Sequence, residues 1–311
     1  MRYFAGIDGG ATKTHCLIGD EDGNLLASGF AGPSNYQVVG QAAAQAALEA
    51  AFHQALREAK LVPDQIAYVL LGLAGADLEQ DFSVLNRICQ GILGTVPFKV
   101  VNDSWIGLKG GNPDNWGVVT VCGTAANTAG RTQDGKEIIL RGMSYEMGNW
   151  GGGMDLLRDA LHWAFRAEEG TAKKTLLAEE IPKLLGKQTM TEIVDTVRSQ
   201  QADPETIYAI PILVFELASA GDEVCQEILI SMGRTLGEMA GGVIARLGLK
   251  GLEVAVTLAG SIFKGTNPLL VDEYTTTVHR IAPRAKIRVA DAEPVYGAYL
   301  MAKDEILSLR E

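Results

Sequence analysis

Cysteine is scarce in this sequence, and its pattern excludes several classes of site. The 311 residues include four cysteines, and no two of them form a C-x-x-C pair. Scattered cysteines favour free thiols in a reducing compartment over disulfides, a metal site or a cluster site. The four histidines are equally dispersed, without metal-ligand spacing. We therefore expect a cytoplasmic protein.

Runs of basic residues and long apolar runs are also missing. Lys and Arg number 27 against 38 Asp and Glu, and the formal net charge is −11. An acidic chain without a basic block argues against nucleic acid or an anionic membrane as partner. The longest apolar stretch, IYAIPILVFELA, contains Pro211 and Glu216 and is too short to span a bilayer. Asp8 interrupts the first apolar run too early for a signal peptide.

The first part of the chain alternates short apolar segments with alanine-rich or amphipathic ones. Asp22 and Gly23 supply the positive φ that a tight hairpin between the second and third segments needs. Strands alternating with helices indicate an α/β fold with a mixed sheet. The pattern predicts strands over residues 3–7, 14–20, 25–31, 66–75 and 98–103, and helices over 41–59 and 78–93.

The pattern starts again after a linker-like stretch, Gly110–Pro113. Residues 116–142 read as strand, Gly/Thr turn, strand, Asp-Gly turn and strand. Mostly helical sequence follows from about 154 to 248, and then come strands over 252–260 and 285–291, with a helix between them, and a final helix over 294–308. We predict two domains, residues 1–112 and 113–311, and the last helix can pack back on the first domain.

The segment GIDGGATKT, residues 6–14, has the composition of a phosphate-binding turn. It lacks the glycine of a Walker A loop, and its glycines open a strand, unlike the helix of a dinucleotide-binding fingerprint. What remains is a hairpin whose turn presents N–H groups and hydroxyls to an anion. The candidate ligands are Gly9, Gly10, Thr12 and Thr14, with Lys13 nearby. Asp8 fits beside phosphate if Mg²⁺, bound through water, lies between them. The alternative is an ordinary glycine-rich hairpin.

Asp103 is the candidate catalytic base. It ends the segment FKVVND, so the strand places its carboxylate at the carboxyl edge of the sheet, where ligands of α/β folds bind. A carboxylate there can take the proton of an attacking hydroxyl. The alternative is that Asp103 caps the next helix.

Three further segments carry polar residues suited to a ligand rich in hydroxyls. Asn35 follows the third strand, Asp77 follows the strand 66–75, and Asn149 lies in MGNWGGG, where small residues leave room for a ligand. The alternative for each is a turn residue that satisfies backbone groups. Their joint placement at strand ends favours a binding role.

These motifs together carry a resemblance. GIDGGATKT, VTVCGTAANTAG and VTLAGSIF resemble the two phosphate loops and the adenosine loop of the actin-like ATPase and sugar kinase superfamily. Their order and spacing resemble most the N-acetylglucosamine kinase branch, which overlaps the BadF/BadG/BcrA/BcrD ATPase family. The resemblance implies two ribonuclease-H-like domains with ATP, Mg²⁺ and a sugar in the cleft between them, and a homodimer.

The resemblance also implies roles for residues of the second half. Gly123 and Thr124 would bind phosphate, and Asn127 the substrate. Gly260, Ser261 and Lys264 would bind the adenosine. Asp103 would be the base that accepts the proton of a sugar hydroxyl, and Asp8 and Asp103 would hold Mg²⁺ through water.

The sequence departs from the resembling kinases in two places. Their second phosphate loop reads G-T-G-S-N, whereas this chain has Ala125 and Ala126 between Thr124 and Asn127. If the position of Ala125 needed a positive φ, alanine would restrict the loop. Their G-D-E-G-S segment corresponds to Gly148–Gly152, in which Asn149 replaces the aspartate.

Three functions are compatible with these observations. The leading hypothesis is an ATP-dependent kinase acting on an amino sugar or N-acetylated hexose. The second is an ATPase that activates a partner enzyme, although the activators that it resembles bridge an iron–sulfur cluster with cysteines. The third is a nucleotide-binding sensor without transfer activity.

Overall fold

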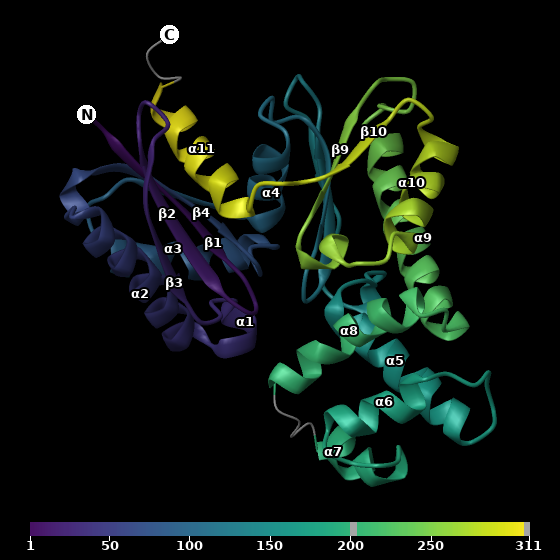
Figure 1. The fold of residues 1–311 in the computed structure, drawn as a ribbon. Coiled ribbons are helices and arrows are strands. Elements are labelled where there is room, and N and C mark those ends of the chain that lie inside the picture. The colour runs from purple at the N-terminus through teal and green to yellow at the C-terminus, as the bar shows by residue number, and fades with distance from the viewer. Residues whose placement is uncertain (200–203, 308–311) are drawn as a thin grey trace.

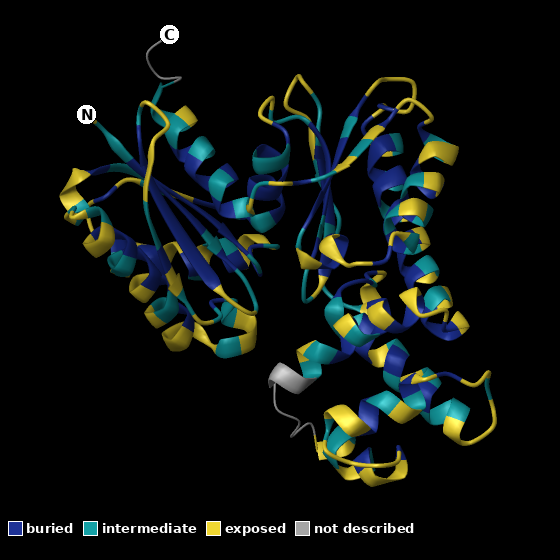
Figure 2. Cartoon of the chain, in the orientation of Figure 1, coloured by how far each residue is buried: buried dark blue, intermediate teal, exposed yellow. Residues whose placement is uncertain are grey.

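The computed structural model describes residues 1–199 and 204–307. Within them the chain forms two sheets, each flanked by helices, that lie side by side, and a group of helices extends from the second sheet (Figure 1). Each sheet has five strands. Figure 2 shows that buried residues concentrate in the two sheets and in the helix faces that cover them.

The first sheet has the strand order β3-β2-β1-β4-β5. Strands β1 to β3 form an antiparallel meander, and β4 and β5 add to β1 in parallel. The strands are β1 (Tyr3–Gly9), β2 (Thr14–Asp20), β3 (Leu25–Ala31), β4 (Ile66–Leu73) and β5 (Phe98–Asn102). The helices of this half are α1 (Tyr36–Val39), α2 (Gln41–Ala59), α3 (Glu79–Leu93) and α4 (Asp103–Gly111), with a 3₁₀ turn at Pro63–Gln65.

The second sheet repeats this arrangement, with the order β8-β7-β6-β9-β10. Again three strands form an antiparallel meander and two add in parallel. The strands are β6 (Gly117–Cys122), β7 (Ala126–Arg131), β8 (Glu137–Ile139), β9 (Ala255–Ala259) and β10 (Lys286–Val289). The repeat that the sequence predicted is therefore present at the level of topology.

Most helices of the second half lie between β8 and β9 in sequence. They are α5 (Gly153–Glu168), α6 (Leu177–Leu184), α7 (Val194–Ser199), α8 (Pro204–Ser219) and α9 (Glu223–Arg246), and α10 (Leu269–Ile281) and α11 (Pro294–Leu307) follow. Short 3₁₀ helices cover Tyr145–Met147, Thr191–Ile193 and Ser261–Lys264. By length and hydropathy α9 could cross a membrane, but 12 of its residues are buried in this half of the protein, as expected of a core helix.

The helix α4 extends into the segment that the sequence suggested as a linker. The sequence suggested a linker at Gly110–Pro113, but Gly110 and Gly111 belong to α4 and lie in a tightly packed region. A Cβ on Gly111 would lie 2.1 Å from Cγ2 of Thr257 in β9, and one on Gly110 would lie 3.3 Å from the backbone nitrogen of Gly297 in α11. These glycines allow close helix packing, so the linker prediction was wrong for them.

Helices α4 and α11 pack against each other between the two sheets (Figure 1). The side chains of Trp105 and Leu108 in α4 pack with Val119 and Ala259 of the second sheet. Conversely, α11 packs on the first sheet, where buried Tyr299 contacts the cluster formed by residues of β1, β2 and β4. The helix after β5 thus packs on the second sheet, and the helix after β10 packs on the first sheet.

Candidate nucleotide and substrate site

Two tight hairpin turns, one from each sheet, meet at the same place. The first turn, residues 10–13, is closed by the Gly10 N–H, which donates to the Lys13 carbonyl at 3.0 Å. The second turn, residues 123–125, is closed by the Gly123 N–H, which donates to the Ala125 carbonyl at 2.9 Å. The hydroxyls of Thr12 and Thr124 lie 2.8 Å apart. The structure thus brings together the two turns that the sequence assigned to phosphate, although 112 positions separate the two threonines.

Within the first turn, the predicted ligands differ in accessibility. Thr12 and Lys13 are exposed, whereas Thr14 is fully buried. The Thr14 hydroxyl donates to the Gly32 carbonyl at 2.7 Å and lies 2.8 Å from the Ser34 hydroxyl. Its side chain therefore holds the turn against the segment after β3, and the prediction that this hydroxyl faces phosphate was wrong.

Three carboxylates lie at or just beyond the ends of neighbouring parallel strands. Asp8 lies near the end of β1, Asp77 follows β4, and Asp103 follows β5. The Asn102 side-chain amide donates to Asp77 Oδ1 at 3.0 Å, which ties the ends of β4 and β5 together. Because parallel strands of one sheet end at the same edge, the three acids share this edge.

Asp103 does not cap α4. The cap is Asn102, whose Oδ1 accepts from the Ser104 N–H at 3.0 Å, and Asp103 is the first residue of the helix. This removes the alternative role that the sequence left open for Asp103. The helix N-terminus also favours a negative charge in its first turn.

The pKa values of these acids are raised. Burial, and then the charge of Asp103, raise the pKa of Asp8 to about 7, while Lys13 acts in the opposite direction. Burial, and then Asp77, raise the pKa of Asp103 to about 6. The pKa of Asp77 is raised by burial and by Asp81, and the hydrogen bond from Asn102 opposes this. Mutual repulsion of carboxylates is relieved when a cation binds between them, so this edge suits a divalent ion.

The three asparagines predicted to bind substrate each make a local hydrogen bond through the side-chain amide group. Asn35 caps α1, because its Oδ1 accepts from the Gln37 N–H at 3.0 Å. Asn127 accepts from the N–H of Thr128 at 2.8 Å. Asn149 is buried, its amide donates to the Ala126 carbonyl at 3.0 Å, and its Oδ1 has no hydrogen-bond partner among the residues that the structure describes. An unpaired buried oxygen costs about 1–3 kcal/mol, so Asn149 is suited to receive a hydroxyl.

The glycines after Asn149 were predicted to leave room for a ligand, but they lie in close contact with the second turn. Gly152 has φ +113°, and a Cβ there would lie 2.6 Å from the Cα of Ala125. The Gly153 N–H donates to the Gly123 carbonyl at 2.7 Å, and the Met154 N–H donates to the Thr124 carbonyl at 3.1 Å. The glycines therefore allow the start of α5 to pack directly on the second turn, which explains them without a ligand.

The alanines of the second turn are compatible with its backbone. Among the described non-glycine residues, positive φ occurs at Lys60 and Asn115 and not at Ala125 or Ala126. The concern that alanine would restrict this loop is therefore not supported.

The residues predicted to bind adenosine follow β9, next to the second turn. Gly260 has φ +107°, and a Cβ there would lie 2.3 Å from the carbonyl oxygen of Cys122, so glycine lets the two strand ends approach. Ser261 and Lys264, in the 3₁₀ helix that follows, are exposed.

One charged residue at this site was missed. Glu293 precedes α11, and its carboxylate lies 3.6 Å from the Lys13 ammonium and 3.0 Å from Nδ1 of His15. It also contributes to the raised pKa of Asp8. No local motif marks Glu293 in the sequence, because its partners lie about 280 positions away.

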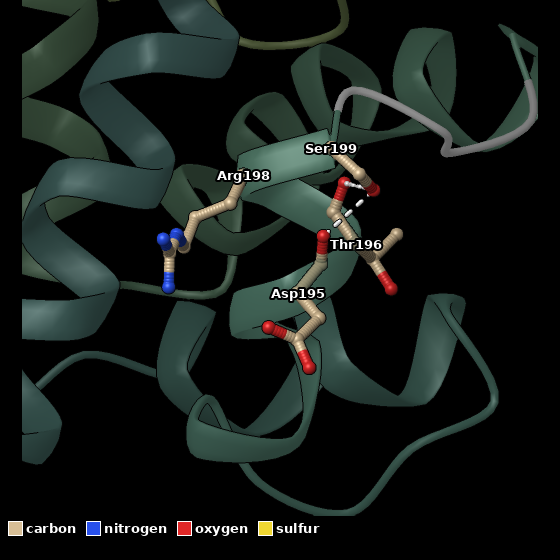
Figure 3. Close-up of a pocket in the computed structure, with 4 residues that line it drawn as sticks. All are labelled: Asp195, Thr196, Arg198 and Ser199. Atoms are coloured by element: carbon tan, nitrogen blue, oxygen red, sulfur yellow. Dashed lines mark hydrogen bonds between the residues drawn. The ribbon is translucent and has the colours of Figure 1, made fainter.

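A surface hollow lies apart from these residues. It has a volume of about 650 Å³ and is lined by α7 residues Asp195, Thr196, Arg198 and Ser199 (Figure 3). The Ser199 hydroxyl there donates to backbone carbonyls of its own helix, at 2.7 Å for Asp195. None of the strand-end residues lines this hollow, so it is separate from the candidate site.

The fold and the paired turns define the class of protein: an α/β protein with two similar sheets and the fold of the actin-like ATPases. The particular family follows from sequence. The family model described as the BadF/BadG/BcrA/BcrD ATPase family matches residues 5–302, and the chain belongs to this family.

Curated relatives match nearly the whole chain. An N-acetylmuramic acid/N-acetylglucosamine kinase of Clostridium acetobutylicum is 26% identical over 305 residues, covering 98% of this chain and 99% of the relative. An N-acetyl-D-glucosamine kinase of Dictyostelium discoideum is 29% identical, covering 96% and 97%. Among solved structures, a candidate N-acetylglucosamine kinase of Chromobacterium violaceum has a TM-score of 0.77 at 21% identity, covering 97% of this chain and 99% of the other.

Proposed function

We propose that this protein is an ATP-dependent kinase that transfers the γ-phosphate of Mg-ATP to a hydroxyl of an amino sugar, with N-acetylglucosamine as the expected substrate. The observation that supports the proposal most is the contact between the two turns. The hydroxyls of Thr12 and Thr124 lie 2.8 Å apart, beside the sheet edge that carries Asp8 and Asp103. The relatives named for N-acetylglucosamine support the substrate class.

In this proposal the two turns hold the phosphates of ATP. Backbone N–H groups of the first turn, the hydroxyls of Thr12 and Thr124, and the ammonium of Lys13 are the groups that suit an anion. The loop of Gly260, Ser261 and Lys264 borders the second turn and would hold the adenosine.

Magnesium fits the acidic edge as a hydrated ion. Among residues 1–199 and 204–307, no group of three His, Cys, Asp or Glu side chains could hold a metal directly. Mg²⁺ commonly keeps several waters and binds through one or two carboxylates plus phosphates. Asp8 and Asp103 would hold it through water, and the ion would neutralise charge on the phosphates.

Asp103 would act as general base. The sugar hydroxyl attacks the γ-phosphorus, its O–H proton moves to Asp103, a new O–P bond forms, and the bond between the γ-phosphorus and the ADP oxygen breaks. A pKa of about 6 leaves Asp103 ionised at neutral pH while keeping it more basic than an ordinary aspartate. Asn35, Asp77, Asn127 and Asn149 would bind the sugar.

We further propose the division into residues 1–112 and 113–311, with α11 packing back on the first domain, and a cytoplasmic homodimer. The contacts of α11 with β1 and β4 support the packing of α11 on the first domain. All four cysteines are buried free thiols, which suits a reducing compartment.

Activation of a partner enzyme is the less favoured function. A cluster shared between two subunits needs cysteines at the surface, whereas Cys16, Cys89, Cys122 and Cys225 are all buried.

The test is ADP release from Mg-ATP against a panel of hexoses that includes N-acetylglucosamine and glucosamine, for the parent and for Asp103→Asn. We expect strong stimulation by one amino sugar, lost in the variant. If no sugar stimulates ADP release while ATP still binds, the kinase proposal is wrong.

A further inference from the structure

The two halves are joined near the first turn by a short connection. Residues 290–293, here called the strap, run from the end of β10 to α11 and cross from the second half to the first (Figure 1). The strap is held at both ends. The Ala290 N–H donates to the Leu258 carbonyl of β9 at 2.8 Å, and the Glu293 carbonyl accepts from the Tyr296 N–H at 3.0 Å.

Both carboxylate oxygens of Glu293 have partners in the first hairpin. Oε2 lies 3.0 Å from Nδ1 of His15, and Oε1 lies 3.6 Å from Nζ of Lys13. Burial opposes ionisation of Glu293, but Lys13 and the hydrogen bond with His15 lower its pKa below the usual range. Glu293 therefore carries its charge beside the phosphate turn.

His15 holds Glu293 from a fixed position. Its side chain is buried, stacks on Phe30 with ring centroids 4.2 Å apart, and places Nε2 3.2 Å from the Ser28 hydroxyl. Burial lowers the pKa of His15, so its neutral ring can donate from Nδ1 to Glu293 and accept from Ser28 at Nε2. The chain of contacts runs from β3 through β2 to the strap.

Lys13 is an exposed member of this group. Its side chain is 58% exposed, and the ion pair with Glu293 is its only salt bridge within the described residues. A long, exposed lysine loses rotamer entropy when it is fixed on a ligand. Because Glu293 already holds the Lys13 ammonium near the turn, less rotamer entropy is lost when the nucleotide binds.

We propose that Glu293 is a positioning residue for the nucleotide: it holds Lys13 beside the first turn and thereby links the strap to phosphate binding. The proposal rests on the nucleotide site assigned above. Glu293 acts through Lys13, so its removal weakens nucleotide binding although it removes a negative charge from the site.

The test is calorimetric binding of Mg-ADP to Glu293→Gln, Lys13→Met and the double variant. Binding needs no sugar, so the result does not depend on the kinase reaction. We expect Glu293→Gln to weaken binding roughly 3- to 30-fold, a range typical of contacting residues, and to have no further effect when Lys13 is already Met. In turnover, the KM for ATP should rise while the sugar KM stays unchanged.

The matched control is the ion pair of Lys99 with Glu305, which also links the first sheet to α11. Glu305→Gln changes the charge equally and should leave binding unchanged. His15→Phe keeps the stacking on Phe30 but removes the Nδ1 donor, and should weaken binding in the same direction as Glu293→Gln. Thermal melts confirm that each variant is folded.

Equal or tighter Mg-ADP binding by folded Glu293→Gln overturns the positioning role, and so does an additive effect in the double variant. If the parent protein binds no nucleotide, both this role and the proposed function are wrong.

Discussion

The two sheets have the same strand topology, but the residues at the ends of their corresponding strands differ in charge. In the first half, Asp8, Asp77 and Asp103 lie at the ends of β1, β4 and β5. In the second half, the ends of β6 and β9, which correspond to β1 and β4, continue into the neutral segments Gly123–Thr124 and Gly260–Ser261, and Asp291 follows β10. The repeated topology thus places candidate functional residues at equivalent strand ends in both halves. The side chains at those strand ends differ, and so do the roles that the two halves can have.

A second comparison concerns the helices after the fifth strands. Helix α4 follows β5 and packs on the second sheet, whereas α11 follows β10 and packs on the first. The two helices also pack on each other, so the contacts between the two sheets run through this helix pair. The acidic and neutral edges are therefore positioned by a shared core.

The sharpest test of this division is Asp103→Asn. If the acidic half carries the chemistry, loss of the base should lower kcat by about 10²- to 10⁴-fold. Steady-state kinetics measure the effect. Asp134, in the exposed turn between β7 and β8 of the second half, is the matched control, and Asp134→Asn should retain activity. An equal loss in both variants would contradict the comparison.

Asp8→Asn should give the next largest effect. Removing one of the two carboxylates proposed to hold hydrated Mg²⁺ should raise the Mg²⁺ concentration needed for half-maximal activity by about 10- to 100-fold. A magnesium titration at saturating ATP and sugar measures this. Asp22→Asn, in the exposed turn between β2 and β3, leaves the requirement unchanged. An unaltered titration in Asp8→Asn would remove Asp8 from the ion site.

In the neutral half, backbone geometry should matter more than charge. Gly152→Ala places a Cβ 2.6 Å from the Cα of Ala125 at a φ of +113°, so it should destabilise the protein by about 1–3 kcal/mol and raise the KM for ATP. Denaturant unfolding and kinetics report the two effects. Gly153→Ala is the control, because its Cβ meets nothing closer than 3.5 Å. Equal stability of the two variants would show that the second turn tolerates the strain.

Asn149→Ala tests whether the second half contributes to sugar binding. Loss of one hydrogen bond to a sugar hydroxyl should raise the sugar KM about 2- to 12-fold, which corresponds to 0.5–1.5 kcal/mol, with the KM for ATP unchanged. Initial rates at varied sugar and fixed ATP measure this. A rise confined to the KM for ATP would instead place Asn149 with the second turn.

The smallest effect is expected for Ala125→Gly. Ala125 has no positive φ, so glycine relieves no strain and adds only freedom to the unfolded chain, which costs about 0.4–1 kcal/mol. Activity should stay within about twofold of the parent, since no contact to the nucleotide changes. A large gain in activity, measured in the same assay, would show that the glycine found in the resembling kinases matters here too.

Local sequence was sufficient for the parts of the site that depend on local structure. Both hairpins, the two turns and the strand that delivers Asp103 follow from apolar alternation and from glycine and Asx-Gly signals over short windows. Thr14 shows the limit of this approach. Its position in the motif suggested a phosphate ligand, but whether its hydroxyl faces solvent or Ser34 depends on how the segment after β3 packs.

The sequence alone therefore determined the order of the strands, the two tight turns proposed to bind phosphate and the carboxylates at strand ends, because turn chemistry and periodicity act over a few residues. Tertiary structure alone decided that Thr12 meets Thr124, that α4 covers the second sheet, and that Glu293 reaches Lys13 and His15. These contacts join positions 112 to 280 residues apart. Their formation depends on the packing of buried surfaces, which no short window of sequence contains.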